Sequence, residues 1–228
     1  MRFTLKLVLS ASLLCVGSAA NAVTLDFEAF STGQIIDDEY TGVTINAING
    51  ISGPNAAVIF DTDNYTGGDT DLAASFSSPQ NPGLIDNLEP GNVLIIQENN
   101  TCSAGFCSNP DDDAAGGVIN IEFDNPVPLL QSIDFFDIEF HEDDGNGTVS
   151  LFDATNALLA VFDIPFTGGD NTWDRLVMDT EDVKRIEISL AGSGAIDNIQ
   201  YVPIPAAVWL FGSGLIGLIG VSRRKKTT

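Results

Sequence analysis

The chain has 228 residues, of which 32 are acidic and nine are basic, and its net charge at pH 7 is −23. All the acidic residues lie between Asp26 and Asp197, where Arg175, Lys184 and Arg185 are the basic ones, so this body carries 3 minus 32, a net charge of −29. Phosphate backbones are bound by clusters of Lys and Arg, so the composition excludes nucleic acid as a partner.

The first 22 residues have the pattern of a secretory signal peptide. Arg2 and Lys6 come before an apolar run over 7–16, and an A-x-A cleavage pattern ends at Ala22. Val23 would then be the first mature residue. A retained anchor is the alternative, but the run is too short to cross a hydrocarbon core of about 30 Å.

Short segments of alternating apolar and polar residues, bounded by Gly, Pro, Asn or Asp, fill the chain from 23 to 201. Alternation at a period of two predicts half-buried strands, and no segment has the periodicity of a convincing amphipathic helix. We therefore predict one all-β domain over 23–201, an antiparallel β-sandwich or jelly roll. The predicted strands are 23–28, 42–48, 56–60, 92–98, 117–123, 132–140, 147–153, 158–165, 175–179, 183–189 and 195–201.

Residues 62–90 form the least regular stretch of this domain, rich in Gly, Asp, Ser and Pro. We expect one or two long surface loops here. Long loops in a compact domain are often functional or mobile.

Carboxylates on the first and last predicted strands form the first candidate site. Asp26 and Glu28 lie in LDFE, and Asp197 lies in IDNI. In sandwich folds these strands often pair, which would bring the three carboxylates to one edge, and calcium takes six to eight oxygen ligands. LDFE and IDNI also resemble the ends of many exported jelly-roll domains of lectin or carbohydrate-binding type. The alternative is that all three side chains lie on a solvated face.

A second group of carboxylates lies in FDTDNYTGGDTDL, residues 60–72. Its D-x-D beginning is that of an EF-hand loop, but Thr66 stands where Gly is required and no Glu occupies position twelve, so it is not an EF-hand. We predict a calcium or similar hard-cation site here, with solvated loop acids as the alternative. The candidate ligands are Asp61, Asp63, Asp69 and Asp71.

The acidic run Asp111-Asp112-Asp113 is the third group. Alone it is weak, because acidic runs are usually solvated. Together with Glu98, it would complete the cation site of the 61–71 loop, with Asp112 as the central residue of the run.

Cys102 and Cys107 remain after the signal peptide and its Cys15 are removed. In an exported protein a disulfide that closes this short loop is the favoured interpretation, and a metal thiolate pair is the alternative. Because the loop is short, we expect its entropic stabilisation to be modest.

Catalysis has little support, because the chain contains no G-x-S-x-G, H-E-x-x-H or P-loop motif. We predict that the protein is not an enzyme. Tyr65 and Trp173 lie in predicted loops and are candidates for stacking on sugar rings, with core or edge packing as the alternative for Trp173.

The C-terminal segment, 202–228, combines a short motif, an apolar stretch and a basic end. The motif is Val202-Pro203-Ile204-Pro205-Ala206, the uncharged stretch runs over 206–221, and Arg223, Arg224, Lys225 and Lys226 follow. As a helix, 206–221 would rise about 24 Å, enough to span a membrane with local thinning, with the basic end cytoplasmic. A simple C-terminal anchor is one interpretation.

This tail closely resembles the VPLPA variant of the PEP-CTERM sorting signal, with Ile204 where Leu is usual. The resemblance covers about a tenth of the chain. It implies recognition by exosortase, temporary tethering in the inner membrane of a Gram-negative bacterium, processing near Pro203 to Ala206, and delivery to the cell surface or extracellular matrix. The 60–72 stretch also resembles a loop common in PEP-CTERM cargo domains.

The sequence thus predicts an exported, non-enzymatic β-sandwich protein of the cell surface or extracellular matrix that binds Ca²⁺. The alternative is a carbohydrate-binding, lectin-like module that acts on exopolysaccharide.

Overall fold

The computed structural model describes residues 21–139 and 147–203, and the secondary structure of these residues is entirely strands, turns and loops. Within them, no helix is long and apolar enough to cross a membrane. Residues 1–20 of the predicted signal peptide (1–22) and the predicted membrane helix over 206–221 lie outside the described residues. The strands are β1 (Val23–Leu25), β2 (Val43–Asn49), β3 (Ala57–Asp61), β4 (Asn92–Ile96), β5 (Cys102–Ser103), β6 (Phe106–Cys107), β7 (Gly117–Val127), β8 (Leu129–Phe136), β9 (Gly147–Phe152), β10 (Leu158–Asp163), β11 (Trp173–Thr180), β12 (Val183–Leu190) and β13 (Ala195–Val202).

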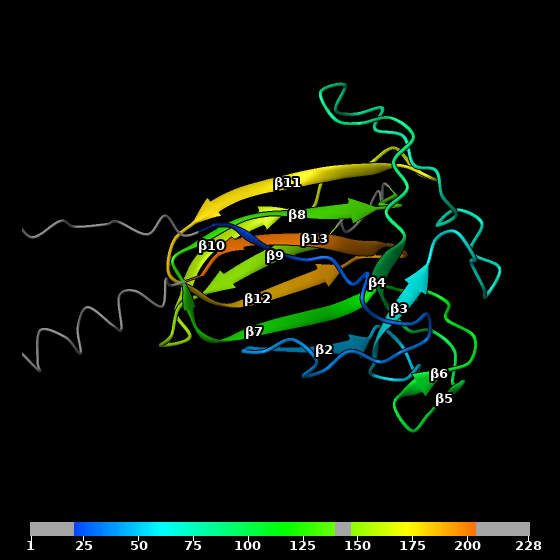
Figure 1. Cartoon of the computed structure of the whole chain (residues 1–228), viewed down its shortest axis with the longest axis horizontal. Helices are drawn as coiled ribbons and strands as arrows, with labels where there is room; N and C mark the ends of the chain where they lie inside the picture. The colour runs from blue at the N-terminus through cyan, green and yellow to red at the C-terminus, as the bar shows by residue number, and fades with distance from the viewer. Residues whose placement is uncertain (1–20, 140–146, 204–228) are drawn as a thin grey trace, which may run out of the picture. The chain divides into compact units, whose positions relative to one another are not determined.

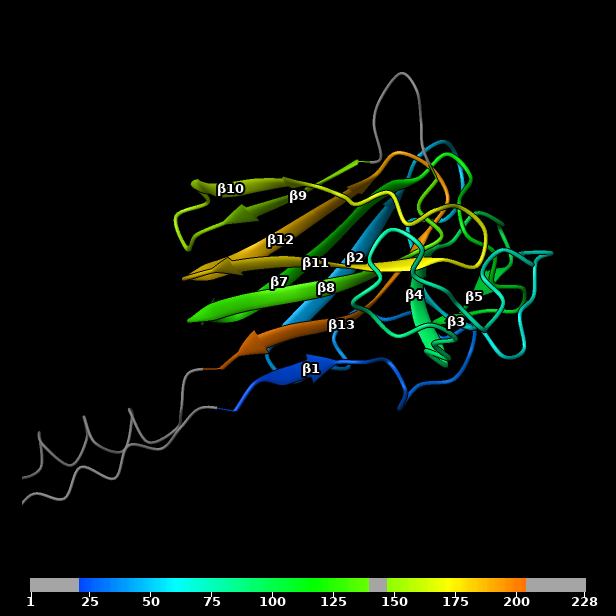
Figure 2. The same cartoon turned by 90° about the horizontal axis from the view of Figure 1, so that it is seen from above.

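Two antiparallel sheets face each other in the described body, as Figures 1 and 2 show. The five-stranded sheet has the order β10-β9-β12-β7-β2, and the six-stranded sheet has the order β11-β8-β13-β4-β3, with β1 added to β13. The predicted all-β antiparallel sandwich is therefore confirmed. Each of the eleven predicted strands overlaps an observed one, and only the two-residue strands β5 and β6 were missed.

The first hydrophobic core fills the space between the two sheets. In β7 and β12 the apolar side chains alternate, so that Ile119, Ile121, Ile186 and Ile188 are fully buried while their neighbours face outward. Residues of the six-stranded sheet, Phe135 among them, pack against them in the same cluster. A period of two thus gives β2, β7, β9 and β12 one buried face each, whereas the edge strand β10 has no buried residue.

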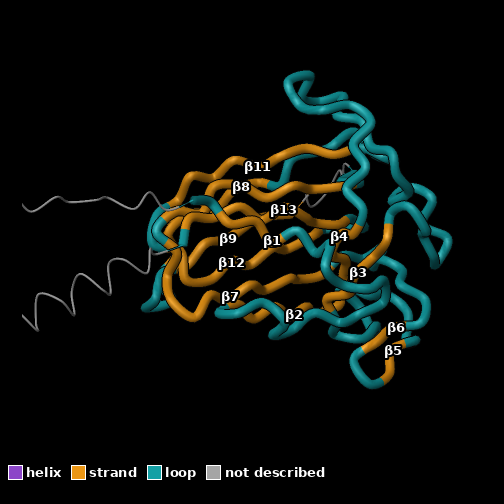
Figure 3. The backbone as a smooth tube through the Cα atoms, in the orientation of Figure 1, coloured by secondary structure: helices purple, strands orange, loops and turns teal. Residues whose placement is uncertain are grey.

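A second hydrophobic core lies on the outer face of the six-stranded sheet. Strands β3 and β4 are apolar at nearly every position, because one face of each contributes to the first core and the other face contributes to the second. Phe76 from the 62–90 stretch is fully buried there, next to Phe136 and Trp173. The 62–90 stretch is therefore not only a surface loop, because it covers this face of the sheet. Figure 3 shows the long loops gathered near the β3 and β4 end of the strands.

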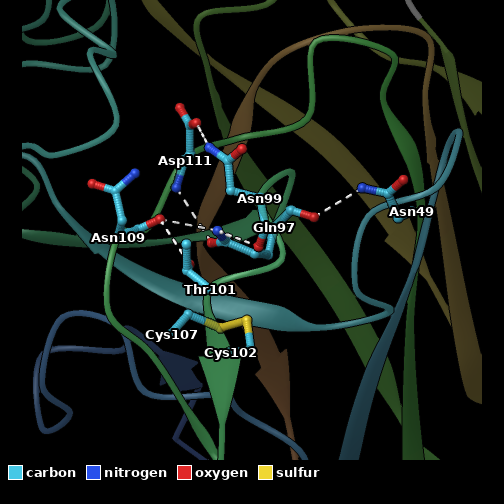
Figure 4. The surroundings of a disulfide bond; sticks show 8 residues. All are labelled: Asn49, Gln97, Asn99, Thr101, Cys102, Cys107, Asn109 and Asp111. Atoms are coloured by element: carbon cyan, nitrogen blue, oxygen red, sulfur yellow. Dashed lines mark hydrogen bonds between the residues drawn. A yellow bond between two sulfur atoms is a disulfide. The ribbon is translucent and has the colours of Figure 1, made fainter.

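A disulfide hairpin projects from the same end of the body. Cys102 of β5 and Cys107 of β6 face each other in register and are joined by a disulfide, so the predicted bond is confirmed. Gln97 holds the segment behind the hairpin: its side-chain amide donates to the Asn109 carbonyl at 3.0 Å, and its Oε1 accepts from the Asp111 amide at 3.3 Å (Figure 4). Gln97 thereby holds the start of the acidic run in place.

Candidate functional site: two carboxylate groups

Strand β13 pairs with two different strands along one of its edges. Its start pairs with β4, through Ala195 and Ile196, and its end pairs with β1, through Ile199 to Tyr201. Asp197 and Asn198 lie at the junction between the two partners. Asn198 has a φ of 50°, and the register with β8 on the other edge shifts at this point, so the strand is bulged here.

Carboxylates gather at this junction. Asp26 and Glu28 follow directly after β1, and together with Asp63 and Asp197 they line an open cavity of about 520 Å³. We call these four residues the edge pocket. The expected pairing of the first and last strands is confirmed, and it brings Asp26, Glu28 and Asp197 to one place as the sequence predicts.

Backbone contacts hold Glu28 at the mouth of the edge pocket. The Asn92 amide donates to Glu28 Oε1 at 2.9 Å, and the Asn92 side chain donates to the Phe30 carbonyl at 3.0 Å. Gly91 has a φ of 73°, and a Cβ there would lie 2.6 Å from Glu28 Oε2. The position therefore needs glycine both for its backbone conformation and for the close approach of the carboxylate.

Asp197 is the buried member of the edge pocket. The residue is 2% exposed, and its Oδ2 accepts from the side-chain Nδ2 of Asn198 at 2.9 Å. Its Oδ1 has no hydrogen-bond partner in the described part of the chain. Burial raises the pKa of Asp197 to about 9, and the charges of Asp134, Glu28 and Asp26 add to the increase. Burial also raises the pKa of Glu28.

The neighbouring arginine does not neutralise this pocket. Arg175, Asp134 and Asp197 are consecutive cross-strand neighbours on β11, β8 and β13. Arg175 binds Asp134 with two hydrogen bonds, of 2.5 and 2.7 Å, which uses the fork of its guanidinium on that one carboxylate. Asp197 is left as an additional buried carboxylate in the row.

A second group of carboxylates forms where the 62–90 stretch meets the acidic run. The Asp112 amide donates to Asp69 Oδ2 at 3.2 Å, and Thr66 Oγ1 donates to the Pro110 carbonyl at 2.8 Å. Gly67 has a φ of 70°, and a Cβ there would lie 2.3 Å from Asp111 Oδ1, so the two loops touch. We call the carboxylates assembled here the loop cluster: Asp69, Asp71, Asp111, Asp112 and Asp137.

Asp112 and Asp137 are the buried members of the loop cluster, with 5% and 1% of their surface exposed. Asp112 Oδ2 accepts from the Gly194 amide at 2.7 Å and from the Ser193 hydroxyl. Asp137 follows β8 with a φ of 55°, and its amide donates to the Thr172 carbonyl at 2.9 Å, while its Oδ1 has no hydrogen-bond partner among the described residues.

The carboxylates of the loop cluster raise one another's pKa. Burial raises the pKa of Asp69 to about 9, with further increases from Asp112 and Asp111. Burial likewise raises the pKa of Asp137 to about 8, helped by the charges of Asp71 and Asp112. Burial raises the pKa of Asp112 only to about 6. The hydrogen bonds from Ser193 and Gly194 favour its charged form and so limit the rise.

The four aspartates that the sequence predicts as one cation site, Asp61, Asp63, Asp69 and Asp71, have different neighbours in the structure. Asp63 lines the edge pocket, and the charges of Asp61 and Asp63 act on Glu28, whereas Asp69 and Asp71 belong to the loop cluster. Asp61 also accepts from the Asp63 and Asn64 amides, at 3.0 and 3.2 Å, and so shapes the turn after β3.

The remaining predicted ligands lie at the border of the loop cluster. Glu98 is exposed, and burial together with the charges of Asp111 and Asp113 raises its pKa. Asp113 accepts from the amides of Gly50 and Ala115, at 3.1 and 2.9 Å, which is a structural use of its carboxylate.

The carboxylate oxygens of three consecutive exposed residues, Asp37, Asp38 and Glu39, lie within 4.8 Å of one another. In the described ranges this is the only group of three or more that lies so close. Their proximity follows from local turn contacts, because the Asp37 amide donates to Glu39 Oε2 at 2.8 Å and the Asp38 amide donates to Asp37 Oδ1 at 2.7 Å. The carboxylate oxygens of the edge pocket and of the loop cluster do not form groups of three within this distance.

The two candidate stacking residues have opposite environments. Trp173 is 3% exposed, its ring stacks on Phe136, and its indole N–H donates to the Ile85 carbonyl at 3.0 Å. Core packing, the alternative given for Trp173, is therefore confirmed, because the ring is almost fully buried against Phe136 and the Arg175 guanidinium lies 5.8 Å from the ring centroid. Tyr65 is 46% exposed, so its stacking role stays a prediction.

The predicted processing residues are described only in part. Val23 begins β1 and pairs with Tyr201, two residues before Pro203, and Ala22 is exposed. Val202 is the last residue of β13, whereas Ile204, Pro205 and Ala206 lie outside the described residues.

The chemistry of both groups favours a hard cation. The described ranges contain three basic residues, and each is bound to a carboxylate outside the two groups: Arg175 to Asp134, Lys184 to Glu122 and Arg185 to Glu187. The acidic side chains of both groups offer oxygen ligands only, which suits calcium rather than a soft metal.

Comparison with known proteins adds little to this geometry. No protein-family model matches the chain, and no curated protein matches it. Among solved structures, a fucose-binding module of Streptococcus pneumoniae matches with a TM-score of 0.28 and 11% identity, over 39% of this chain and 67% of that chain. The K2 cleaved adhesin domain of Lys-gingipain matches with a TM-score of 0.41 and 10% identity, over 80% of this chain and 99% of that chain. Likenesses this distant carry no argument about function.

Proposed function

We propose that this protein is a non-enzymatic, calcium-binding β-sandwich protein of the cell surface or extracellular matrix. The observation that carries the proposal is the edge pocket, where Asp197 lines one cavity together with Asp26, Glu28 and Asp63, and where its buried Oδ1 has no hydrogen-bond partner in the described residues. Without a cation, a buried carboxyl group of this kind is kept neutral by its raised pKa, because its charged form would cost several kcal/mol, and a bound cation would favour the charged form.

Calcium suits the edge pocket better than magnesium. Calcium accepts six to eight oxygen ligands in flexible geometries, whereas magnesium requires near-ideal octahedral geometry at about 2.0–2.1 Å. The pocket offers carboxylates from three separate segments around an open cavity, so water molecules can complete an irregular shell. We expect a dissociation constant of about 10⁻⁴–10⁻³ M, as in extracellular calcium modules.

A calorimetric titration of the purified full chain with calcium tests this site. Asp197→Asn keeps the size of the side chain and one acceptor oxygen but removes its charge, so we expect it to abolish binding at the edge pocket. Asp163→Asn is the matched control, because Asp163 lies exposed at the end of β10, on the other sheet. Unchanged binding in Asp197→Asn would reject the assignment.

Export and sorting form the second part of the proposal. The support is the signal-peptide pattern over 1–22 and the resemblance of 202–228 to the VPLPA variant of the PEP-CTERM signal. The protein would pass through the inner membrane of a Gram-negative bacterium and be processed by exosortase near Pro203 to Ala206. Mass spectrometry of the C-terminus of the secreted form tests this, and a terminus intact through Thr228 would favour a plain anchor.

Carbohydrate binding is the second candidate function. It is favoured by the exposed ring of Tyr65, which lies in the loop that joins the two carboxylate groups, and exopolysaccharide would be the ligand class. Glycan-array binding that is lost in Tyr65→Ala but kept in Tyr65→Phe would support this role. Equal binding by wild type and Tyr65→Ala would remove it.

A further inference from the structure

The loop cluster contains a buried carboxylate, Asp137, that lies outside the edge pocket. Asp137 is 1% exposed, lies directly after β8 and has an Oδ1 atom without a hydrogen-bond partner in the residues described. Sequence reasoning did not select it, and it is separate from the four residues of the edge pocket. A buried carboxylate oxygen without a partner is rare in folded proteins and calls for a ligand or a proton.

Negative groups from several elements surround Asp137. The Asn171 amide donates to the Asp71 carbonyl at 2.8 Å, and the next residue, Thr172, accepts from the Asp137 amide at 2.9 Å. On the other side, the Gly194 amide donates to Asp112 Oδ2 at 2.7 Å, and a Cβ at Gly194 would lie 3.7 Å from the Asp137 carbonyl oxygen. The charges of Glu139 and Asp170 also act on Asp137. No charge of the opposite sign is among the groups that act on it, and the three basic residues of the described ranges are bound elsewhere. Within the ranges 21–139 and 147–203, Asp137 is therefore surrounded by several carboxylates, and no basic residue is paired with it.

We propose that the loop cluster is a second divalent-cation site, with Asp137 as its buried ligand and Asp71 and Asp112 as its ligands from the two loops. The ion would be calcium or another hard divalent cation, since all three ligands are carboxylates. Asp69 and Asp111 lie close enough to each other to share a hydrogen bond in the ion-free form and would complete the negative shell.

This site would hold the 62–90 stretch more extensively than the edge pocket, to which that stretch contributes Asp63 alone among the four carboxylates. The ligands of the loop cluster come from the 62–90 stretch, from the acidic run behind the disulfide hairpin and from the end of β8, which are far apart in sequence. One ion would join these segments across the outer face of the six-stranded sheet. Calcium would therefore order the loop that carries Tyr65, and any ligand binding by that loop would depend on calcium.

The alternative is that Asp137 holds a proton instead of an ion. The two cases differ in the effect of Asp137→Asn, since asparagine resembles a protonated carboxyl group but is a much poorer calcium ligand. A protonated Asp137 predicts unchanged calcium binding in the variant. An ion ligand predicts that the variant loses one of two calcium equivalents and loses the protection that calcium gives to the 62–90 stretch against proteolysis.

The experiment titrates the full chain with calcium after treatment with a chelator. We expect two equivalents in the wild type and in the Asp163→Asn control, and one in Asp137→Asn. Asp197→Asn should also retain one, and in that variant the remaining ion should still protect the 62–90 stretch. The two sites can thus fail separately, because loss of the edge pocket alone leaves the Asp137-dependent equivalent in place.

Terbium luminescence locates the second ion independently. Trp173 pairs with Phe136, the residue before Asp137, so its indole should sensitise terbium bound in the loop cluster. We expect the tryptophan-excited emission to persist in Asp197→Asn and to disappear in Asp137→Asn and in Trp173→Phe. If Asp137→Asn does not fold, Asp71→Asn replaces it with the same expected losses. Two calcium equivalents and full emission in the folded variant would overturn the proposal.

Discussion

The edge pocket and the loop cluster are both rich in carboxylates, but they are assembled in different ways. Strand pairing builds most of the edge pocket: β1 meets β13 in a fixed register, and Asp26, Glu28 and Asp197 follow from that register. Tertiary contacts between loops build the loop cluster, such as the hydrogen bond from Thr66 to the Pro110 carbonyl. The edge pocket should therefore depend less on the loops, which contribute only Asp63 to its four carboxylates. The loop cluster should depend on everything that holds the loops in place.

The largest expected effect comes from the second hydrophobic core beneath the loop cluster. Phe76→Ala removes a fully buried aromatic ring from the 62–90 stretch and should lower the free energy of unfolding by about 3–5 kcal/mol. Calcium binding at the loop cluster should be lost, while binding at the edge pocket remains. Chemical denaturation and calorimetry measure the two effects.

Ile85→Ala is the matched control for this prediction. Ile85 lies in the same stretch but is 66% exposed, so the change in stability should stay within about 0.5 kcal/mol. If Phe76→Ala abolished binding at both carboxylate groups equally, the contrast between them would not hold.

Removal of calcium is expected to have the next largest effect. At a calcium concentration about 100 times the dissociation constant, each site should contribute about 2.7 kcal/mol to the free energy of unfolding. Thermal unfolding with calcium and with chelator should show the sum of two such contributions in the wild type. Asp137→Asn and Asp197→Asn should each remove one. A wild-type protein whose stability does not respond to calcium would contradict both assignments.

Reduction of the disulfide should have a smaller effect and should act on one carboxylate group. The bond closes a loop with a sequence separation of five, for which chain entropy gives a stabilisation of about 2 kcal/mol. The hairpin leads directly into the Asn109 to Asp111 segment, which Gln97 holds by hydrogen bonds. Because Asp111 belongs to the loop cluster, reduction should weaken binding there and leave the edge pocket unchanged. A Cys102→Ala, Cys107→Ala double variant, which should not respond to reductant, is the control.

A more gradual effect is expected from pH in the ion-free protein. The pKa values of Asp137 and Asp197 are raised to about 8 and about 9, above the unfolded value of about 3.9, so folding favours their neutral forms. Their contribution to stability is complete below the unfolded value and is lost as the pH rises through the folded values. Stability in chelator should therefore fall between about pH 5 and pH 9, and calcium should flatten this dependence. A constant or rising stability in chelator would contradict this prediction.

The sequence predicted the parts of the molecule that depend on strand periodicity. The eleven strands of three or more residues were predicted from short apolar segments, most of them alternating, between turn residues. The meeting of Asp26, Glu28 and Asp197 was predicted from the pairing of the first and last strands. The sequence did not predict β5 and β6, because strands of two residues are too short to show alternation.

The loop cluster was predicted only in part, because the partners of a loop depend on contacts that have no periodicity. Asp61 and Asp63 are close to Asp69 and Asp71 in sequence, yet they belong to a different group. The sequence around Asp137 does indicate burial, because an aspartate that follows two phenylalanines in an apolar strand has no polar face to occupy. For Trp173 the sequence left core packing and sugar stacking open, because its position beside a glycine-rich segment gave no sign of the second core.

A crystal structure of the protein grown in calcium is the most direct test of the central claim that these carboxylate groups hold ions. We predict one ion in the edge pocket and one in the loop cluster, within about 2.3–2.6 Å of the Asp197 and Asp137 carboxylates respectively. Both carboxylates free of metal at millimolar calcium, with their Oδ1 atoms bound to water or to a shared proton, would contradict it.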